Sequence, residues 1–386
     1  KNVGGFFSKM KILFYAGDEF LSDQRNGGQQ VSIRNYRFLC QIFGAENVHI
    51  VIFCNEDISN KAVNVKRFPK HRNKIEQFYN CIFMRNGYSR RVERKVTEYI
   101  TKLQPDIIFF DHTFTGGILH KLDAKLRKKM VIISYVHNVV KHYVWEKVIH
   151  ESVLFIIPYL SYCRNEKIMM KEADRVIAIN QRDAEELQKL YGRKKDFILP
   201  VTYQDKFDSS CLDGKRNEIT TILFVGSYFG PNIQGIRWFI RHVLPYVKGN
   251  VKLEIIGKDM ERLRKELQSS VVDVIGTVEA TEPYYYHADL VVIPIPYGSG
   301  MKTKTAEAMM YGKYIIGSKE ALEGYDIKDL QYMKECTTET EFIKEINHFL
   351  KVKNENGFYP EVRERMEELK AMVLNENGMQ MLKGVG

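Results

Sequence analysis

The sequence has little that would place this protein within a membrane or in an oxidising compartment. No run of about 18 or more apolar residues occurs, so a helix that spans a membrane is not expected. The six cysteines are scattered, with no Cys-x-x-Cys pair and no histidine cluster beside them. That pattern argues against a disulfide framework and a zinc site and favours reduced thiols. With no recognisable signal peptide before the first strand, we expect a cytoplasmic protein.

Several ligand-binding fingerprints are missing as well. Neither half of the chain opens with a Gly-x-Gly-x-x-Gly dinucleotide motif, and there is no P-loop with its Gly-Lys-Ser/Thr ending. No Asp-x-Asp occurs anywhere, so no such carboxylate pair is available to hold a metal ion over a diphosphate. We therefore expect neither a metal ion nor a bound cofactor.

The positive charge is placed unevenly along the chain. Residues 1–200 hold 34 Lys and Arg against 21 Asp and Glu, whereas the remainder holds 24 against 27. Within residues 60–104 there are 12 basic side chains and three acidic ones, with aromatic residues between them. Such a stretch is either a solvated face or a surface for an anionic partner such as a membrane leaflet, a lipid diphosphate or nucleic acid. The aromatic residues favour the anionic membrane, and we expect no nucleic acid.

Strand-like and helical segments alternate twice along the chain. In the first half, apolar runs such as "KILFYAG", "VHIVIF" and "PDIIFFDH" alternate with segments of helical periodicity, and the pattern restarts at "TILFVGSYFG". Apolar strands alternating with helices predict parallel sheets covered on both faces. We expect doubly wound domains over 1–205 and 206–355, and a helix over 356–386 that crosses back to the first domain. Ligands are expected at the carboxyl ends of the strands, in the cleft between the domains.

The segment "PYGSGMKTKTAEAMMYGK", residues 296–313, has the most informative chemistry. Residues 298–301 form a glycine-rich loop at a predicted helix N-terminus, where free backbone N–H groups and the helix dipole favour an anion. Lys302 and Lys304 place two cations at that same end, each opposing the dipole by a few tenths of a kcal/mol. A bound diphosphate would reverse this penalty. The alternative is an ordinary glycine turn with solvated lysines.

Glu307 follows three residues after Lys304, about one helical turn along. A carboxylate at this place suits the two hydroxyls of a ribose, because it can accept a hydrogen bond from each. It could also form an i, i+3 ion pair with Lys304, worth at most about 0.5 kcal/mol. The spacing leaves both interpretations open.

At this point the chain resembles a known family. The segment "GSGMKTKTAEAMMYGKYIIGS" is similar to the donor-binding segment of retaining, family-4-type (group 1) glycosyltransferases of the GT-B fold. Weaker similarities are carried by "GGQQVSIRNYRFL", "YVHNVV" and "EADRVIAINQRDAEEL" in the first half and by "ILFVGSYFGPNIQGIRWFI" in the second. The resemblance spans most of residues 10–325. It implies an α/β fold in which two Rossmann-like domains face a central cleft.

The resemblance also implies which residues bind a nucleotide-diphosphate sugar. Glu307 would hold the ribose, residues 275–276 would lie beside the base, and the remaining positions would surround the diphosphate. His137 would reach the sugar across the cleft and act with Lys302 and Glu307 in catalysis, although it could equally be a satisfied core histidine. The implied donor-binding set is Gly27, Gly28, Gly226, Ser227, Ile275, Gly276, Gly298, Ser299, Gly300, Met301, Lys302, Thr303, Lys304 and Glu307.

This chain departs from the family pattern at two places. Many members carry a second glutamate eight residues before the ribose glutamate, and Ser299 stands at that position here. Many also carry arginine and lysine in the loop after the first strand of the second domain, where this chain has "GSYFGPN". The diphosphate would therefore depend on Lys302 and Lys304.

Together these features predict a metal-independent transfer of a sugar from a nucleotide-diphosphate donor, with retention of configuration. We expect a UDP-sugar as the donor and a hydroxyl acceptor in a surface polysaccharide or lipid-linked glycan. The enzyme would be cytoplasmic and peripheral on the inner face of the membrane. Two alternatives remain open from the sequence: an inactive partner subunit that binds a nucleotide sugar, and a nucleotide-sugar epimerase of the same fold.

Overall fold

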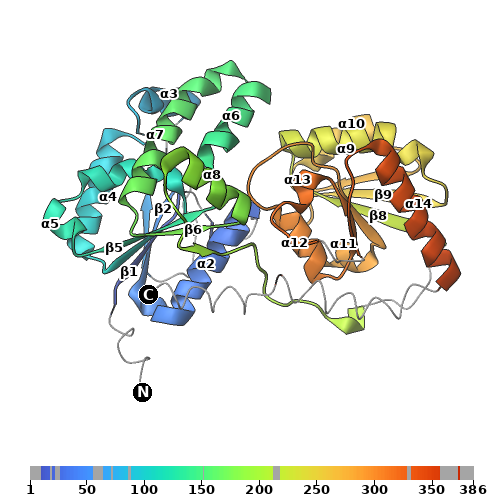
Figure 1. The fold of residues 1–386 in the computed structure, drawn as a ribbon, viewed down its shortest axis with the longest axis horizontal. Coiled ribbons are helices and arrows are strands. Elements are labelled where there is room, and N and C mark those ends of the chain that lie inside the picture. The colour runs from blue at the N-terminus through green and yellow to red at the C-terminus, as the bar shows by residue number, and fades with distance from the viewer. Residues whose placement is uncertain are drawn as a thin grey trace. The chain divides into compact units, whose positions relative to one another are not determined.

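The structure, a computed structural model, describes residues 10–17, 20–21, 27–54, 64–70, 73–85, 88–150, 152–211, 218–327, 332–356 and 373. The chain divides between Pro200 and Val201 into two compact units. Figure 1 shows that each unit has a central sheet with helices on both sides. The helix expected over residues 356–386 lies almost entirely outside the described residues.

The first unit is built on a seven-stranded sheet in which every neighbouring pair is parallel. The strand order is β3-β2-β1-β4-β5-β6-β7. Its strands are β1 (Ile12–Tyr15), β2 (Val48–Phe53), β3 (Val65–Phe68), β4 (Ile107–Phe110), β5 (Val131–Val136), β6 (Arg175–Ala178) and β7 (Phe197–Ile198).

Helices cover both faces of this sheet. They are α2 (Gly27–Phe43), η1 (Ala45–Asn47), α3 (Lys74–Ile82), α4 (Arg90–Leu103), η2 (Thr113–Lys121), α5 (Ala124–Arg127), α6 (Val140–His150), η3 (Val153–Phe155), α7 (Ile156–Glu172) and α8 (Gln181–Tyr191). Successive side chains of a strand point to opposite faces, so a sheet covered on both sides needs apolar residues at every position. In β1, Phe14 stacks on Phe109 of β4 at 5.6 Å between ring centroids, and Tyr15 packs against Phe110 at 4.8 Å.

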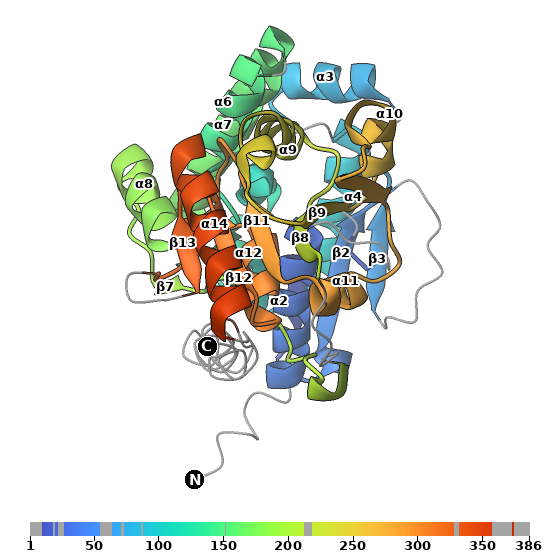
Figure 2. The ribbon, with the colours of Figure 1, turned by 90° about the vertical axis from the view of Figure 1, so that its right-hand side faces the viewer.

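The second unit repeats the arrangement with six parallel strands in the order β10-β9-β8-β11-β12-β13. Its strands are β8 (Thr220–Val225), β9 (Val251–Ile256), β10 (Val272–Gly276), β11 (Leu290–Ile293), β12 (Tyr314–Gly317) and β13 (Met333–Glu335). Its helices are η4 (Ser209–Cys211), α9 (Gly230–His242), η5 (Leu244–Tyr246), η6 (Met260–Leu263), α10 (Arg264–Leu267), α11 (Glu282–His287), α12 (Thr303–Met310), α13 (Lys319–Leu322) and α14 (Glu339–Asn356). Figure 2 shows α12 and α14 beside β12.

The two doubly wound sheets confirm the fold class expected from the sequence. The short edge strands β3 and β13 are additions to the strands that apolar runs had indicated. Both contain partly or fully exposed side chains, unlike the buried central strands. They therefore lack the continuous apolar runs by which the other strands were identified. Among the described residues, no helix is long and apolar enough to cross a membrane.

Candidate functional site

The glycine-rich loop joins β11 to α12 at the carboxyl edge of the second sheet. Gly300 has a φ of +63°, a left-handed conformation that glycine adopts without strain. Lys302 is the residue that precedes the first turn of α12. Its Nζ donates to Glu320 Oε1 at 2.6 Å and to the carbonyl oxygen of Ser299 at 3.1 Å. The positive charge of Lys302 is therefore already balanced by a carboxylate, so only part of the charge mismatch expected at this helix is present.

Lys304 is the second residue of α12, and among the described residues no carboxylate forms an ion pair with it. Its Nζ donates to the side-chain oxygen of Asn232 at 2.5 Å and lies 5.1 Å from the centre of the Phe224 ring. Burial, together with the nearby charge of Lys302, lowers the pKa of Lys304 to about 7. A buried ammonium with a neutral partner is costly, and an incoming anion would lower that cost.

Close contacts between glycines allow the lysine to reach the end of β8. A Cβ atom on Gly226 would lie 2.9 Å from the Nζ of Lys304, and one on Gly257 would lie 2.1 Å from the carbonyl oxygen of Gly226. The amide of Gly257 in turn donates to the carbonyl oxygen of Gly276 at 2.8 Å. The ends of β8, β9 and β10 are thus drawn together, and the expected diphosphate-binding and base-binding positions lie along the same edge of the sheet.

Glu307 is held away from Lys304 by two hydroxyl groups. Its Oε1 accepts from Thr281 Oγ1 at 2.8 Å, and its Oε2 accepts from the hydroxyl of Tyr285 at 3.2 Å. Burial raises the pKa of Glu307, and the two hydrogen bonds act against that rise. The carboxylate therefore accepts hydroxyl hydrogen bonds in the described structure instead of forming the ion pair that was the alternative.

The other predicted residues of this unit take simpler positions. The carbonyl oxygen of Ser227 accepts from Asn232 at 2.8 Å, and that of Thr303 accepts from the Tyr203 hydroxyl at 3.2 Å. Ile275 and Gly276 end β10, Gly298 lies beside Lys302, and Met301 is buried. The Ser299 hydroxyl oxygen is buried and has no hydrogen-bond partner in the described structure. An unsatisfied buried hydroxyl in this loop is available to a ligand oxygen.

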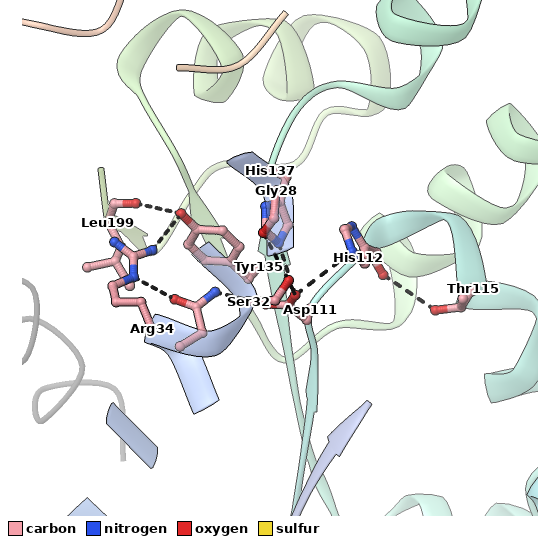
Figure 3. Close-up of polar contacts among 10 residues, drawn as sticks. Gly28, Ser32, Arg34, Asp111, His112, Thr115, Tyr135, His137 and Leu199 are labelled. Atoms are coloured by element: carbon pink, nitrogen blue, oxygen red, sulfur yellow. Dashed lines mark hydrogen bonds and ion pairs between the residues drawn. The ribbon is translucent and has the colours of Figure 1, made fainter. Parts of the chain in front are cut away.

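In the first unit, His137 belongs to a polar cluster around a fully buried carboxylate (Figure 3). Asp111 follows directly after β4, and His137 follows β5. The Oδ2 of Asp111 lies 3.1 Å from His137 Nε2 and 2.5 Å from Ser32 Oγ, while its Oδ1 accepts from Asn35 Nδ2 at 2.8 Å. Ser32 also lies 3.1 Å from the carbonyl oxygen of Gly28, so the cluster links His137 to the glycine-rich start of α2.

Aromatic and cationic side chains complete the cluster. The ring of His137 stacks on His112 with 4.5 Å between centroids and meets Tyr135 edge-on at 4.8 Å. The Tyr135 hydroxyl accepts from Arg34 at 3.0 Å and donates to the carbonyl oxygen of Leu199 at 2.9 Å. His137 is thus fixed on two sides of its ring, and it is not an isolated core histidine.

The cluster also shows how the buried carboxylate stays ionised. Burial by itself would raise the pKa of Asp111, but His137 and the hydrogen bonds around it bring the net pKa below its ordinary value. Since Asp111 faces Nε2, that nitrogen carries a proton and Nδ1 becomes the acceptor of a neutral ring. This tautomer is inferred from the hydrogen-bond partners.

Asp111, His112 and His137 also have the composition of a metal site. Their ligand atoms lie within 4.8 Å of one another, the one such group found in the described part of the chain. The Nε2 atoms of both histidines lie near the same oxygen of Asp111, at 3.1 Å for His137 and 3.9 Å for His112. The hydrogen bond between His137 and Asp111 uses two of these ligand atoms, so a metal ion would have to displace the proton on His137.

A second buried carboxylate fixes the segment that follows His137. Glu166 of α7 accepts from the backbone amides of Val140 and Lys141, at 2.8 and 3.2 Å, and so satisfies the first N–H groups of α6. It also accepts from the Tyr191 hydroxyl at 2.7 Å. Helix α6 is thereby held at the carboxyl edge of the sheet, directly after the His137 loop.

Several residues of these sites were missed by reasoning from the sequence: Ser32, Asn35, Asp111, Asn232, Thr281, Tyr285 and Glu320. For Asp111 a signal existed, because a charged residue that directly follows an apolar strand lies at the ligand edge of a parallel sheet. Asn232 and Glu320 gave no such signal, because their partners are 72 and 18 residues away in the chain.

Comparison with known proteins adds to this geometry. Residues 27–199 match the pattern of a family described as Glycosyltransferase Family 4, and residues 219–351 match one described as Glycosyl transferases group 1. No protein of curated function matches the sequence.

Solved structures resemble the whole chain. Anabaena HepE in complex with UDP superposes with a TM-score of 0.72 at 13% identity, covering 97% of this chain and 99% of that one. Sucrose-phosphate synthase from Thermosynechococcus elongatus gives 0.70 at 14%, covering 97% and 98%. WaaG, a glycosyltransferase involved in lipopolysaccharide biosynthesis, gives 0.68 at 16%, covering 97% and 100%. With both halves matched and the two sheets in place, the chain belongs to the group 1, or family 4, glycosyltransferases of the GT-B fold.

Proposed function

We propose that this enzyme transfers a sugar from a UDP-sugar to a hydroxyl acceptor in a surface polysaccharide or a lipid-linked glycan, without a metal ion and with retention of configuration. It would act in the cytoplasm, on the inner face of a membrane. The proposal assigns the donor nucleotide to the edge of the second sheet and the reacting sugar to the neighbourhood of His137.

Lys304 is the main evidence for placing the donor at this edge of the sheet. Its ammonium group is buried beside the backbone of Gly226, with Asn232 as a neutral partner and with Ser299 offering an unsatisfied hydroxyl in the adjacent loop. A cation at the start of a helix, beside these polar groups, suits the two phosphates of a nucleotide diphosphate. Transfer of the sugar leaves its charge on the departing diphosphate, and a preorganised cation stabilises that charge as it builds.

Glu307 would hold the ribose of the nucleotide. It already accepts hydrogen bonds from two hydroxyls, Thr281 and Tyr285, so its lone pairs are directed for such donors. A ribose diol would replace or share these bonds without a new charge being buried. Ile275 and Gly276, at the end of β10 on the same edge, would then border the base.

His137 would contact the sugar, and Asp111 would hold the His137 ring in position. With Nε2 directed at Asp111, Nδ1 is left to accept a hydrogen bond from a sugar hydroxyl. Gly27 and Gly28, at the start of α2, would face the diphosphate from this unit. Asp111 is a positioning residue in this scheme, because it acts through the imidazole.

Relatives support the finer choice of donor and acceptor. The HepE structures contain UDP and UDP-glucose, and WaaG acts in lipopolysaccharide biosynthesis. Ser299 replaces a carboxylate common in the family, so the sugar would be held with fewer charged contacts than usual, a difference that bears on which sugar is accepted.

Calorimetric titration with UDP, GDP and ADP, in buffer without divalent cations, tests the proposal. We expect UDP to bind most tightly, with Lys304→Met and Glu307→Gln each weakening it about tenfold or more, as the loss of charge-assisted hydrogen bonds predicts. Lys265→Met, at an exposed lysine on α10, is the matched control and should bind like the wild type. Equal binding of UDP by all four proteins would contradict the assignment, and tighter GDP or ADP binding would change the donor.

A further inference from the structure

Exposed apolar side chains are concentrated on one part of the first unit. Of the large apolar residues that the described structure leaves exposed, most belong to α3 and to the segment from α6 through η3 into α7. These are Ile75, Tyr79, Ile82, Phe83, Trp145, Ile149, Val153, Leu154, Ile156 and Leu160. We call this set the apolar face. Figures 1 and 2 agree in placing α3, α6 and α7 side by side at one end of the unit.

The apolar face contains the three most exposed large apolar side chains of the described structure. Ile75 is 79% exposed, Val153 71% and Leu154 69%. Single exposed apolar residues are ordinary, but a contiguous apolar area on a soluble domain marks an interaction surface. The rings of Trp145 and Tyr159 pack at 5.2 Å, which ties α6 to α7 across the face.

The stretch 60–104, expected from its sequence to meet a membrane, divides between two roles. Helix α4 buries Val92, Val96 and Ile100 in the core, while its Lys95 and Lys102 line a hollow of about 690 Å³ together with residues 66–69. Helix α3 instead presents its apolar residues to the outside. The apolar face thus draws one part from α3, within the basic stretch, and the other part from residues 145–160, outside it. The membrane contact expected for 60–104 stays a prediction.

The chemistry around the apolar face fits a lipid surface with anionic headgroups. Lys147 lies 4.8 Å from the centre of the Tyr143 ring, and Arg85 lies 4.9 Å from that of Phe83 while it also pairs with Glu93 at 3.6 Å. Cations beside aromatic side chains are typical of segments that lie in the boundary between headgroups and acyl chains. Residues 1–200 also carry 34 basic against 21 acidic side chains, which would attract an anionic leaflet.

One part of the apolar face begins close to His137 in the chain. Helix α6 begins at Val140, three residues after His137, and Glu166 fixes that start. The apolar face therefore continues from the edge of the sheet where the proposed sugar site lies. A lipid-linked acceptor held in the membrane would be presented next to that edge.

We propose that α3, α6, η3 and the start of α7 form a docking surface for a lipid bilayer that contains anionic lipids. The side chains of the apolar face enter the headgroup boundary, and the neighbouring cations contact the anionic headgroups. This inference extends the proposed function, but it concerns the first unit alone and does not depend on donor binding.

Vesicle flotation with the full chain tests the inference. Vesicles of phosphatidylcholine and phosphatidylglycerol at 7:3 should bind the protein, pure phosphatidylcholine should bind it less, and added salt should reduce the difference. The double variant Ile149→Glu/Leu154→Glu should bind about 30-fold or more weakly, because two apolar side chains would no longer be buried in lipid. Tyr246→Glu, at an exposed aromatic residue of the second unit, is the control and should bind like the wild type.

Fluorescence and sedimentation complete the test. A blue shift of tryptophan emission on adding vesicles should occur in the wild type and be lost in Trp145→Phe. UDP affinity should be the same in the double variant and the wild type, so that failure of docking and failure of donor binding are distinguished. Absence of binding to both vesicle types would overturn the proposal. So would a concentration-dependent dimer that only the double variant lacks, because the face would then belong to a second copy of this chain.

Discussion

The two units handle a buried charge in opposite ways. In the first, Asp111 has partners for both oxygens in Ser32, Asn35 and His137, and its pKa is lowered despite complete burial. In the second, the ammonium of Lys304 has a neutral amide as its partner, and its pKa falls to about 7. A satisfied charge fixes the group beside it, whereas an unsatisfied one leaves binding energy for a ligand. Under the proposed function, the first arrangement positions His137 and the second binds the donor.

The largest effect is expected at Asp111. Asp111→Asn replaces an acceptor of His137 by a group that can present an N–H, so the ring loses its orientation. We expect kcat to fall about 10²-fold or more, with UDP affinity little changed, because most of the proposed nucleotide contacts belong to the second unit. Ser32→Ala, which removes one partner of Asp111 and leaves the carboxylate, should lose less. A loss of UDP affinity equal to the loss of kcat would contradict the positioning role.

The second effect is at Lys304, where we expect one substitution to lower activity and raise stability. Lys304→Met should lower kcat/KM about 10²-fold by removing a cation from the leaving diphosphate. It should also raise the thermal midpoint of the free enzyme, because a costly buried ammonium is gone. The folded pKa lies below the unfolded value, so the cost is full below pH 7 and declines as pH rises toward the unfolded pKa near 10.4. Calorimetric scans at pH 6 and 9 check the sign: the gain should be larger at pH 6.

The same lysine predicts a pH dependence of UDP binding. The bound diphosphate should raise the pKa of Lys304, so above pH 7 binding takes up a proton. Between pH 7 and 9 the charge of UDP changes little, since a terminal phosphate titrates near 6. Affinity should therefore be flat just below pH 7 and fall by up to about tenfold per pH unit above it. Lys304→Met should remove this slope, and a slope that persists in the variant would assign the titration to another group.

A smaller and opposite effect is expected at Glu320. This carboxylate holds Lys302 at 2.6 Å, so a donor must compete with it for the ammonium group. Glu320→Gln should free that charge and tighten UDP about threefold, within the range of a partly exposed ion pair. Glu323→Gln, a few residues further along, is the control. Weaker binding in Glu320→Gln would mean that the pair is needed to hold Lys302 in place.

The smallest effect concerns metal ions. Turnover should be the same with added EDTA and with added Mg²⁺, because Lys302 and Lys304 take the place of a cation at the diphosphate. Zn²⁺ is the informative addition, since Asp111, His112 and His137 could bind it only by disrupting the hydrogen bond to His137. If Zn²⁺ inhibits the wild type but not His112→Ala, the three side chains of this cluster bind the metal ion.

The sequence predicted the parts of this molecule that are encoded locally. Apolar strands, a glycine-rich loop and lysines at a helix start are patterns within a few residues, so the sheets and the position of Lys304 could be inferred. The partners of these groups could not. Asp111 meets Ser32 across 79 positions, and Lys302 meets Glu320 across 18, so whether a charge is satisfied depends on the packed fold.

The apolar face shows the same limit. Periodicity indicated a helix over residues 90–104, but it identified neither α3 nor the fact that α4 turns its apolar side inward while α3 turns it outward. That choice depends on which helix lies over the sheet, and α3 instead packs beside α7. Composition alone therefore placed the expected membrane surface across 60–104, whereas the exposed apolar side chains lie partly at residues 145–160.

The strand order of the first sheet has a consequence for how the chain is made. Strand β1 lies between β2 and β4, and Ile12 pairs with Val48 on one side but with Ile107 on the other. During synthesis one edge of this fully apolar strand stays unpaired until about a hundred further residues have been added. Unpaired edges and long-range pairing slow folding and favour aggregation. We therefore expect the yield of active protein to depend on translation rate and on chaperones that bind the nascent first unit.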